Sequence, residues 1–121
     1  MSIVSYQDLL VWQRAMDFVE ICYKLTQNFP KEELFGLSSQ LKRASVSIPS
    51  NIAEGHGRIS RGEYIHFLGI AQGSLRESET QLILSFRLKF ISEYQLTEAL
   101  AKSKEIGILL GKLIRVLKEK T

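Results

Sequence analysis

Apolar residues recur at spacings of three and four along four segments of this 121-residue chain, without the strict alternation that is typical of strands. Such spacing places the apolar side chains on one side of a helix. The segments cover residues 8–28, 31–55, 60–89 and 92 onward, with short connections between them. This pattern predicts an all-α, up-down-up-down antiparallel four-helix bundle. We expect one domain over residues 1–121.

The first segment has more apolar surface than one position in a small bundle requires. Phe18, Ile21 and Leu25 widen its surface beyond a single stripe. The extra width indicates either a subunit interface or additional core packing. Pro30 predicts the end of this helix. Its expected face consists of Trp12, Ala15, Met16, Val19, Cys22 and Tyr23.

The second segment contains a proline inside a helical pattern. Pro49 lacks an N–H and crowds the carbonyl four residues before it. Because Ile52 and Ala53 continue the periodicity, we expect the helix to kink here and not to end; a direct ligand contact is the alternative. Asn51 falls on the apolar seam, where a polar side chain needs hydrogen-bond partners. The seam itself consists of Leu34, Leu37, Leu41, Ala44 and Ile48.

Helix ends and close contacts are also marked in the sequence. Gly55 and Gly57 predict a helix end in the left-handed conformation that glycine favours. Residues 60–63 and 92–95 fit the Ser-x-x-Glu/Gln capping box that opens a helix. Two glycine pairs predict close helix–helix approach in the third and fourth segments: Gly69 with Gly73, and Gly107 with Gly111.

Composition narrows the class of protein without naming a reaction. Sixteen basic and 13 acidic residues give a formal net charge of +3, which permits polyanion binding but does not require it. The single cysteine, Cys22, excludes an intrachain disulfide and fits a reducing compartment. Neither a secretory signal nor a membrane-spanning apolar run is apparent. We therefore expect a cytoplasmic protein without membrane association.

Motifs for catalysis or metal binding are weak. Glu63 and His66 form one Glu-x-x-His unit, but a di-iron bundle needs two such units and further glutamates. The second histidine, His56, lies in a glycine-rich turn. Serines near Glu54 and His56 lack the Gly-x-Ser-x-Gly pattern of a nucleophile elbow. We expect no catalytic residue, cofactor or metal.

Basic residues offer a better candidate site. The turn at residues 55–61 leads into a helix N-terminus, where backbone amides and arginines together favour an anion. With few aromatic residues free for base stacking, contacts to nucleic acid would be to phosphate and independent of sequence. Assembly into a ring would multiply a weak basic patch. The predicted contacts are Lys42, Arg43, Arg58, Arg61 and Arg76, with Arg87 and the lysines of the last helix as further candidates.

Several stretches resemble a known bacterial family. They are residues 6–15 (YQDLLVWQRA), 29–30 (FP), 33–37 (ELFGL), 40–55 (QLKRASVSIPSNIAEG) and 71–77 (AQGSLRE). They resemble the four-helix bundle proteins encoded in intervening sequences of large-subunit ribosomal RNA genes. Accessory variability proteins of diversity-generating retroelements are related to these. The similarity runs from about residue 6 to residue 117.

The resemblance implies a kinked four-helix bundle that assembles into a homopentameric, barrel-like ring. It also implies possible partners, since the retroelement relatives bind nucleic acid and associate with a reverse transcriptase. It supplies no agreed set of functional residues. Our sequence hypothesis is a non-enzymatic oligomeric accessory protein that binds RNA or DNA. The alternative is a homo-oligomeric protein-interaction scaffold without nucleic-acid binding.

Overall fold

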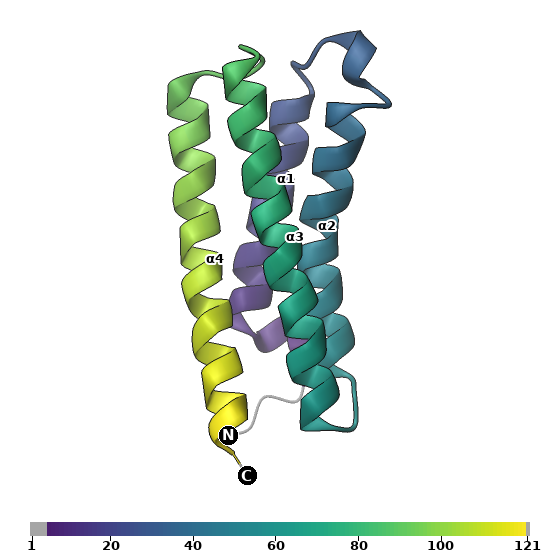
Figure 1. Ribbon diagram of the computed structural model, residues 1–121, viewed down its shortest axis with the longest axis vertical. Helices are drawn as coiled ribbons and strands as arrows, with labels where there is room; N and C mark the ends of the chain where they lie inside the picture. The colour runs from purple at the N-terminus through teal and green to yellow at the C-terminus, as the bar shows by residue number, and fades with distance from the viewer. Residues whose placement is uncertain (1–4, 121) are drawn as a thin grey trace.

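The computed structural model describes residues 5–120 and consists of four long helices that lie side by side (Figure 1). Each helix packs against two neighbours, in the cyclic order α1, α2, α3, α4. The predicted antiparallel four-helix bundle is confirmed. In the described residues no helix is long and apolar enough to cross a membrane. The helices are α1 (Leu10–Thr26), α2 (Leu37–His56), α3 (Arg61–Arg87) and α4 (Glu93–Glu119), with 3-10 turns η1 (Tyr6–Asp8) and η2 (Lys31–Glu33).

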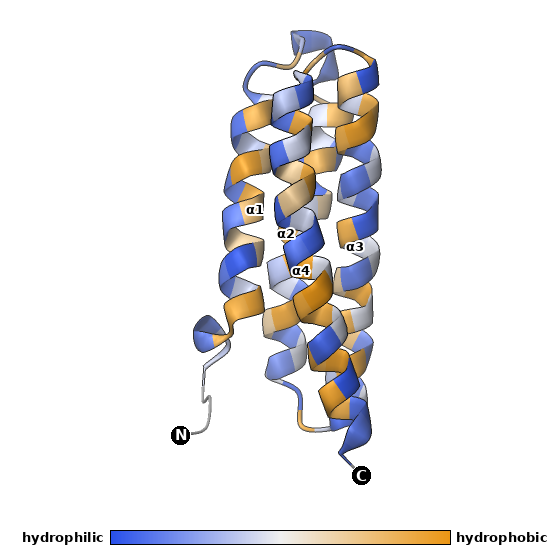
Figure 2. Cartoon of the chain, turned by 90° about the vertical axis from the view of Figure 1, so that its left-hand side faces the viewer, coloured by the Kyte–Doolittle hydropathy of each residue, from blue (hydrophilic) through white to orange (hydrophobic). Residues whose placement is uncertain are grey.

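All four helices contribute to one hydrophobic core. Orange and blue residues alternate around each helix, as an amphipathic pattern requires (Figure 2). Burying one large apolar side chain contributes about 1.5–3 kcal/mol, so this shared core is the main stabilising element. The largest fully buried apolar side chains are Phe18, Leu41, Ile48, Ile52, Leu68, Leu75, Leu82, Ile106 and Leu110.

The buried side of α1 differs from the predicted face. The expected Ala15 and Cys22 are fully buried, but Met16 and Tyr23 are 38% and 42% exposed. Since α1 packs against both α2 and α4, its buried side combines part of the predicted face with Phe18 and Leu25 from the wider apolar surface. Met16, Val19 and Tyr23, which we call the second apolar line of α1, remain at least partly exposed. The buried apolar residues of α1 are Val11, Ala15, Phe18, Cys22 and Leu25.

The predicted helix starts, at about residue 8 and near residues 31–34, lie two to six residues before the observed starts at Leu10 and Leu37. Leu9 is extended (φ −74°, ψ 125°) and separates η1 from α1. Gly36 (φ −110°, ψ −114°) likewise separates η2 from α2, whose Leu37 N–H donates to the Glu33 carboxylate at 3.0 Å. Leu34 therefore lies outside the bundle seam and is 56% exposed.

Helix α2 continues through Pro49, as predicted, and Pro49 is buried. The kink at this residue stays a prediction. Asn51 is half-buried, and its amide donates to the carbonyl and the hydroxyl of Ser47 at 2.8 and 2.9 Å. The Ser47 hydroxyl in turn pairs with the hydroxyl of Ser74 on α3 at 2.8 Å. Asn51 therefore finds its partners within α2, and Ser47 makes the bond between helices.

Glycine allows the closest approach between α2 and α3. A Cβ at buried Gly55 would lie 2.8 Å from Phe67 Cβ and 3.2 Å from the Tyr64 carbonyl oxygen. The predicted left-handed helix end was wrong, because Gly57 has φ −81° and none of the glycines in residues 5–120 has a positive φ. The role of Gly55 is close packing.

The glycine pairs of α3 and α4 have different surroundings. A Cβ at Gly107 would meet Leu75 and Arg76 of α3 at 3.6 Å, as close packing predicts. A Cβ at Gly69, Gly73 or Gly111 would have open space within 4 Å, so the predicted close approach at these three positions is wrong within the chain.

Both predicted helix starts carry a serine N-cap, but only the second of the two predicted capping boxes is complete. The Ser60 hydroxyl accepts from the Glu63 N–H at 3.1 Å. Ser92 and Gln95 form the full reciprocal capping box, at 2.8 and 3.1 Å. These caps satisfy amides that a helix leaves unpaired at its start.

Candidate functional site

The five predicted contact residues do not form one cluster. Lys42 and Arg43 lie near the start of α2, Arg58 and Arg61 lie at the α2–α3 turn, and Arg76 lies within α3. At a rise of about 1.5 Å per residue, Lys42 is roughly 20 Å along the helix axis from the end of α2. One small ligand cannot contact both ends of this helix.

Arg58 is held in place by two neighbours. Its guanidinium pairs with Glu54 at 2.6 Å and lies over the Phe67 ring, 4.7 Å from the centroid. Both partners of the ion pair are half exposed, so the pair is worth no more than about 1 kcal/mol. Arg61 is exposed and forms no ion pair with any residue in the range 5–120. The turn thus presents one oriented arginine and one free arginine.

Arg76 belongs to the contact between α3 and α4. Its guanidinium donates to both carboxylate oxygens of Glu79 at 3.0 and 3.1 Å. It lies 3.6 Å from the position of a Cβ at Gly107, and Glu79 also accepts from Ser103 of α4. Its charge is matched within the same helix turn, so Arg76 is a weaker candidate for a phosphate contact than Arg61.

The start of α2 holds the other two predicted residues. Lys42 is half-buried, and its ammonium lies over the Tyr23 ring of α1 at 5.2 Å from the centroid. Such a contact stabilises by about 0.5–1 kcal/mol at an exposed site and fixes the lysine stem. Arg43 is exposed and, within the described residues, has no ion-pair partner.

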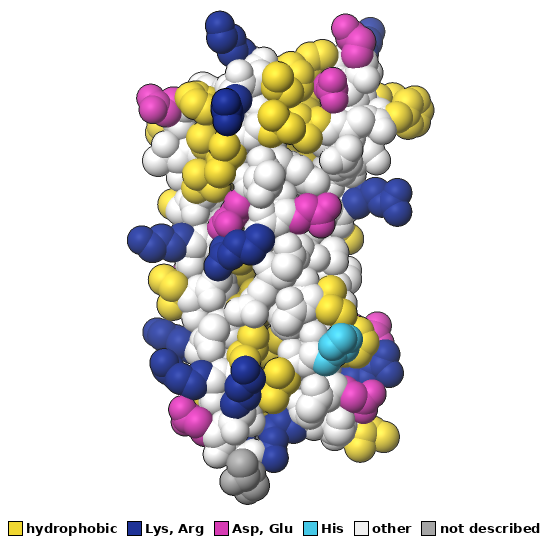
Figure 3. Space-filling view, viewed as in Figure 1, with side chains coloured by type: hydrophobic (Ala, Val, Ile, Leu, Met, Phe, Trp, Pro, Cys, Tyr) yellow, Lys and Arg dark blue, Asp and Glu magenta, His cyan; other side chains and the backbone are white. Residues whose placement is uncertain are grey.

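Basic residues gather at the lower end of the bundle, which we define by the α2–α3 turn and the last two turns of α4. Both elements lie at the same end of the molecule (Figure 1). Dark-blue side chains concentrate over the lower part of α4 in the space-filling view (Figure 3). The acids of these two elements are Glu54, Glu63 and Glu119. Its basic residues are Arg58, Arg61, Lys112, Arg115, Lys118 and Lys120.

The amides of the α2–α3 turn are largely used within the chain. The N–H groups of Gly57 and Arg58 donate to the carbonyls of Ala53 and Gly55, and that of Glu63 donates to Ser60. The Glu63 carboxylate also occupies the first turn of α3, where it repels a second anion. A phosphate at this end would therefore meet arginine and lysine side chains, and backbone amides contribute little.

Cys22, His56 and His66 are the side chains that metal binding or nucleophilic chemistry would use first. Within residues 5–120 no three His, Cys, Asp or Glu side chains gather closely enough to hold a metal ion. Burial raises the pKa of the Cys22 thiol from 9.0 to about 12, against the opposing effect of a hydrogen bond with Ser45. A thiol with this pKa stays protonated at neutral pH and is a poor nucleophile.

An apolar groove runs between α1 and α2 on the outside of the bundle. Met16, Val19 and Val46 contribute to it, and part of it follows the second apolar line of α1. Its two adjoining depressions, of about 310 and 530 Å³, share Val19 and Val46. We call this surface the α1–α2 groove. Its first depression is lined by Tyr6, Trp12, Met16, Val19, Val46, Pro49, Ser50 and Ala53, and its second, more polar depression adds Glu20, Tyr23, Lys24 and Gln27. The width of the first apolar segment was the only sequence signal for it.

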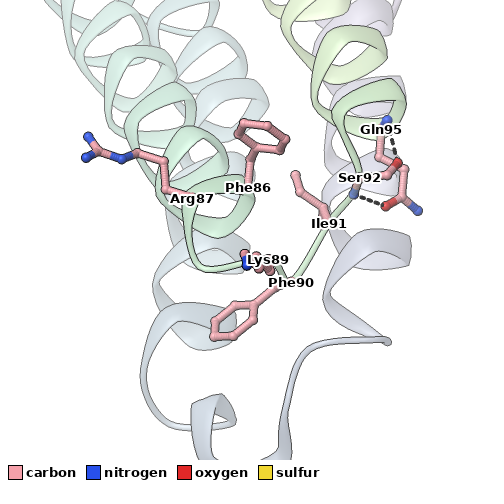
Figure 4. A pocket seen from close by; sticks show the side chains of 7 residues that line it. All are labelled: Phe86, Arg87, Lys89, Phe90, Ile91, Ser92 and Gln95. Carbon is pink, nitrogen blue, oxygen red and sulfur yellow. Dashed lines mark hydrogen bonds between the residues drawn. The ribbon is translucent and has the colours of Figure 1, made fainter.

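A further depression of about 590 Å³ lies at the α3–α4 turn, at the upper end of the bundle. Phe86 and Ile91 point into the space between the two helices, while Arg87 points away and Phe90 points toward the α1–α2 connection (Figure 4). Phe90 packs on Phe29 with ring centroids 5.4 Å apart. Arg87 therefore does not join the other predicted contacts.

Comparison with known proteins assigns the family. A family model described as "23S rRNA-intervening sequence protein" matches residues 7–112. A crystal structure of a protein of unknown function from the S23 ribosomal protein family of Bacteroides thetaiotaomicron is similar, with 30% identity and a TM-score of 0.78. The alignment covers 87% of this chain and 98% of that one. Among curated proteins none matches. The chain belongs to the family of 23S rRNA-intervening sequence proteins.

Proposed function

We propose that this chain is a non-enzymatic, oligomeric accessory protein of the cytoplasm that binds RNA or DNA through phosphate contacts at the lower end of the bundle. The observation that carries the proposal is the meeting of two basic elements there. The α2–α3 turn brings Arg58 and Arg61 to the end where α4 finishes with Arg115 and Lys118. The family description, which refers to a ribosomal RNA gene, is consistent with a nucleic-acid partner.

The expected binding is weak and sensitive to salt. Each phosphate that a basic side chain neutralises releases counterions, so affinity falls as salt concentration rises. The bases are not read, because contacts to phosphate carry no direct information about the base sequence. In an oligomer the basic ends of several subunits would act on one long polyanion and raise its apparent affinity.

The double variant Arg58→Glu/Arg61→Glu tests this proposal. We expect weaker binding of single-stranded RNA or DNA in gel-shift assays and a flatter dependence on salt, because two phosphate contacts are lost. The matched control is Arg87→Glu/Lys104→Glu, which makes the same charge change on exposed residues away from the lower end and from the α1–α2 groove. Circular dichroism should show the same helix content in both variants. Equal loss of binding in both would reduce the effect to net charge, and unchanged affinity in Arg58→Glu/Arg61→Glu would refute the site.

A scaffold function is the second candidate, and the α1–α2 groove favours it. Met16, Tyr23 and Val46 are each more than a third exposed in this apolar groove, as in a surface that another subunit covers. The family resemblance implies a pentameric ring. In this case the basic charge would serve solubility only, and wild-type protein would give no gel shift even at low salt.

Val46→Asp tests the role of the groove in assembly. A carboxylate in an apolar interface is costly to bury, so we expect a smaller species in light scattering with an unchanged circular dichroism spectrum. Ile108→Asp is the matched control, since Ile108 is 50% exposed on α4, away from the groove. An unchanged mass for Val46→Asp, or the same loss of mass for Ile108→Asp, would exclude the groove as the interface.

A further inference from the structure

A second depression at the upper end of the bundle has the features of a small-ligand site. It lies beneath the connection between α1 and α2 and has a volume of about 430 Å³, within the range of roughly 300–1,000 Å³ that small-molecule sites occupy. Phe29, Pro30 and Leu34 supply apolar surface, and Lys31 and Lys42 supply positive charge. Its lining contains no acidic residue. We call it the η2 pocket.

The polar lining of the η2 pocket includes the hydroxyl of Ser38. Ser38, at the start of α2, is 4% exposed as a residue, and its hydroxyl makes no hydrogen bond within residues 5–120, so it is free to bond a molecule in the pocket. The amide N–H groups of Ser38 and Ser39 also find no acceptor in this part of the chain, as expected in the first turn of a helix. These donors and the positive helix end favour an acceptor with negative charge.

The charged residues around the η2 pocket also favour an anion. Lys42 is held over the Tyr23 ring, which limits the motion of its stem. The carboxylate of Glu33 in η2 accepts a hydrogen bond from the Leu37 N–H at 3.0 Å. It caps the helix from the outside and leaves both lysines without an ion-pair partner among the described residues.

We propose that the η2 pocket binds a small amphiphilic anion, whose carboxylate or phosphate group lies near Lys31, Lys42 and the Ser38 hydroxyl and whose apolar part packs on Phe29, Pro30 and Leu34. The shared chemistry of the ligand is one anionic head joined to an apolar body. This site is independent of the proposed nucleic-acid contacts, since it lies at the opposite end of the bundle from Arg58 and Arg61.

Titration with four probes, followed by the backbone amide signals in NMR, tests the ligand class. The probes are hexanoate, hexyl phosphate, hexanol and inorganic phosphate. We expect saturable shifts of the Ser38 and Ser39 amide signals with hexanoate or hexyl phosphate. Hexanol lacks the anionic head and inorganic phosphate lacks the apolar body, so each should bind at least about tenfold more weakly, which corresponds to about 1.4 kcal/mol. The stronger of the two hexyl probes identifies the head group. Equal binding of inorganic phosphate, or no saturable shift with either hexyl probe, would overturn the proposal.

Variants test the residues of the site. We expect a lower affinity for the tighter-binding hexyl probe in each of three variants: Ser38→Ala, Lys31→Gln and Lys42→Gln. The control Lys104→Gln changes an exposed lysine on α4 and should leave this affinity unchanged. Ser38→Ala keeps a good helix former at a helical position, so it should fold normally. Lys31 lies outside the long helices, so the probe affinity of Lys31→Gln still tests the site if Lys42→Gln disturbs packing on Tyr23. Full affinity in both Ser38→Ala and Lys31→Gln would refute the site, while Arg58→Glu/Arg61→Glu should bind the probe normally.

Discussion

The two flanks of α2 use the same short block of sequence in different ways. Toward α3, small residues bring the helices together: Gly55 lies against Phe67, and the hydroxyls of Ser47 and Ser74 bond at 2.8 Å. Toward α1, the outer side stays open, with Val46 and Pro49 in the α1–α2 groove. One flank is closed by close contact and hydrogen bonds, and the other leaves apolar surface uncovered. A helix can therefore complete a fold on one side and leave an interaction surface on the other.

The largest effect on stability is expected at Gly55, where α2 approaches α3 most closely. Gly55→Ala places a Cβ 2.8 Å from Phe67 Cβ, and we expect a loss of about 1–3 kcal/mol in the free energy of unfolding from overpacking. The matched change Gly73→Ala meets open space and should stabilise the protein by up to about 1 kcal/mol through helix propensity. Urea denaturation measures both. If the two substitutions change stability in the same direction, the close contact at Gly55 does not govern packing.

A smaller effect is expected from the hydrogen bond between the helices. Ser47→Ala leaves Ser74 without its partner and should cost about 1 kcal/mol. Ser50→Ala, an exposed position on the other flank, should change stability by less than about 0.5 kcal/mol. The double variant Ser47→Ala/Ser74→Ala should recover part of the loss in thermal unfolding, because both polar partners are removed together. A full additive loss would contradict this coupling.

The smallest effect on stability at neutral pH is expected from the ionisation of the Cys22 thiol, which lies on α1 beside Ser45. Burial raises the pKa of this thiol from 9.0 to about 12, so the folded state keeps a proton that the unfolded state releases between these values. Its contribution to stability is fully present below pH 9 and decreases as pH rises toward 12. Denaturant unfolding at pH 7 and pH 10 should show a steeper loss in wild type than in Cys22→Ala. Parallel losses would assign the alkaline effect to other groups.

Much of the fold followed from the sequence because periodicity and capping are local properties. The four helices, the continuation of α2 through Pro49 and the cap at Ser92 were predicted from spacing and side-chain chemistry. Helix starts were less accurate, since Leu9 and Gly36 interrupt patterns that look continuous. Of the proposed site, Arg58 and Arg61 were predicted from the sequence and stay a prediction, whereas the sequence did not indicate that Arg76 is paired with Glu79.

The sequence alone determined that four amphipathic helices form and that α1 has more apolar surface than one stripe. Helical periodicity depends on neighbours three and four residues away, so it can be read along the chain. Only the tertiary structure decided which apolar line of α1 faces the core, which glycines meet another helix and which basic residues share an end of the bundle. These outcomes depend on the rotation of each helix about its axis and on contacts between residues far apart in sequence. For the same reason, the η2 pocket has no signature in the sequence: Lys31, Ser38 and Lys42 come together only when η2 folds over the start of α2.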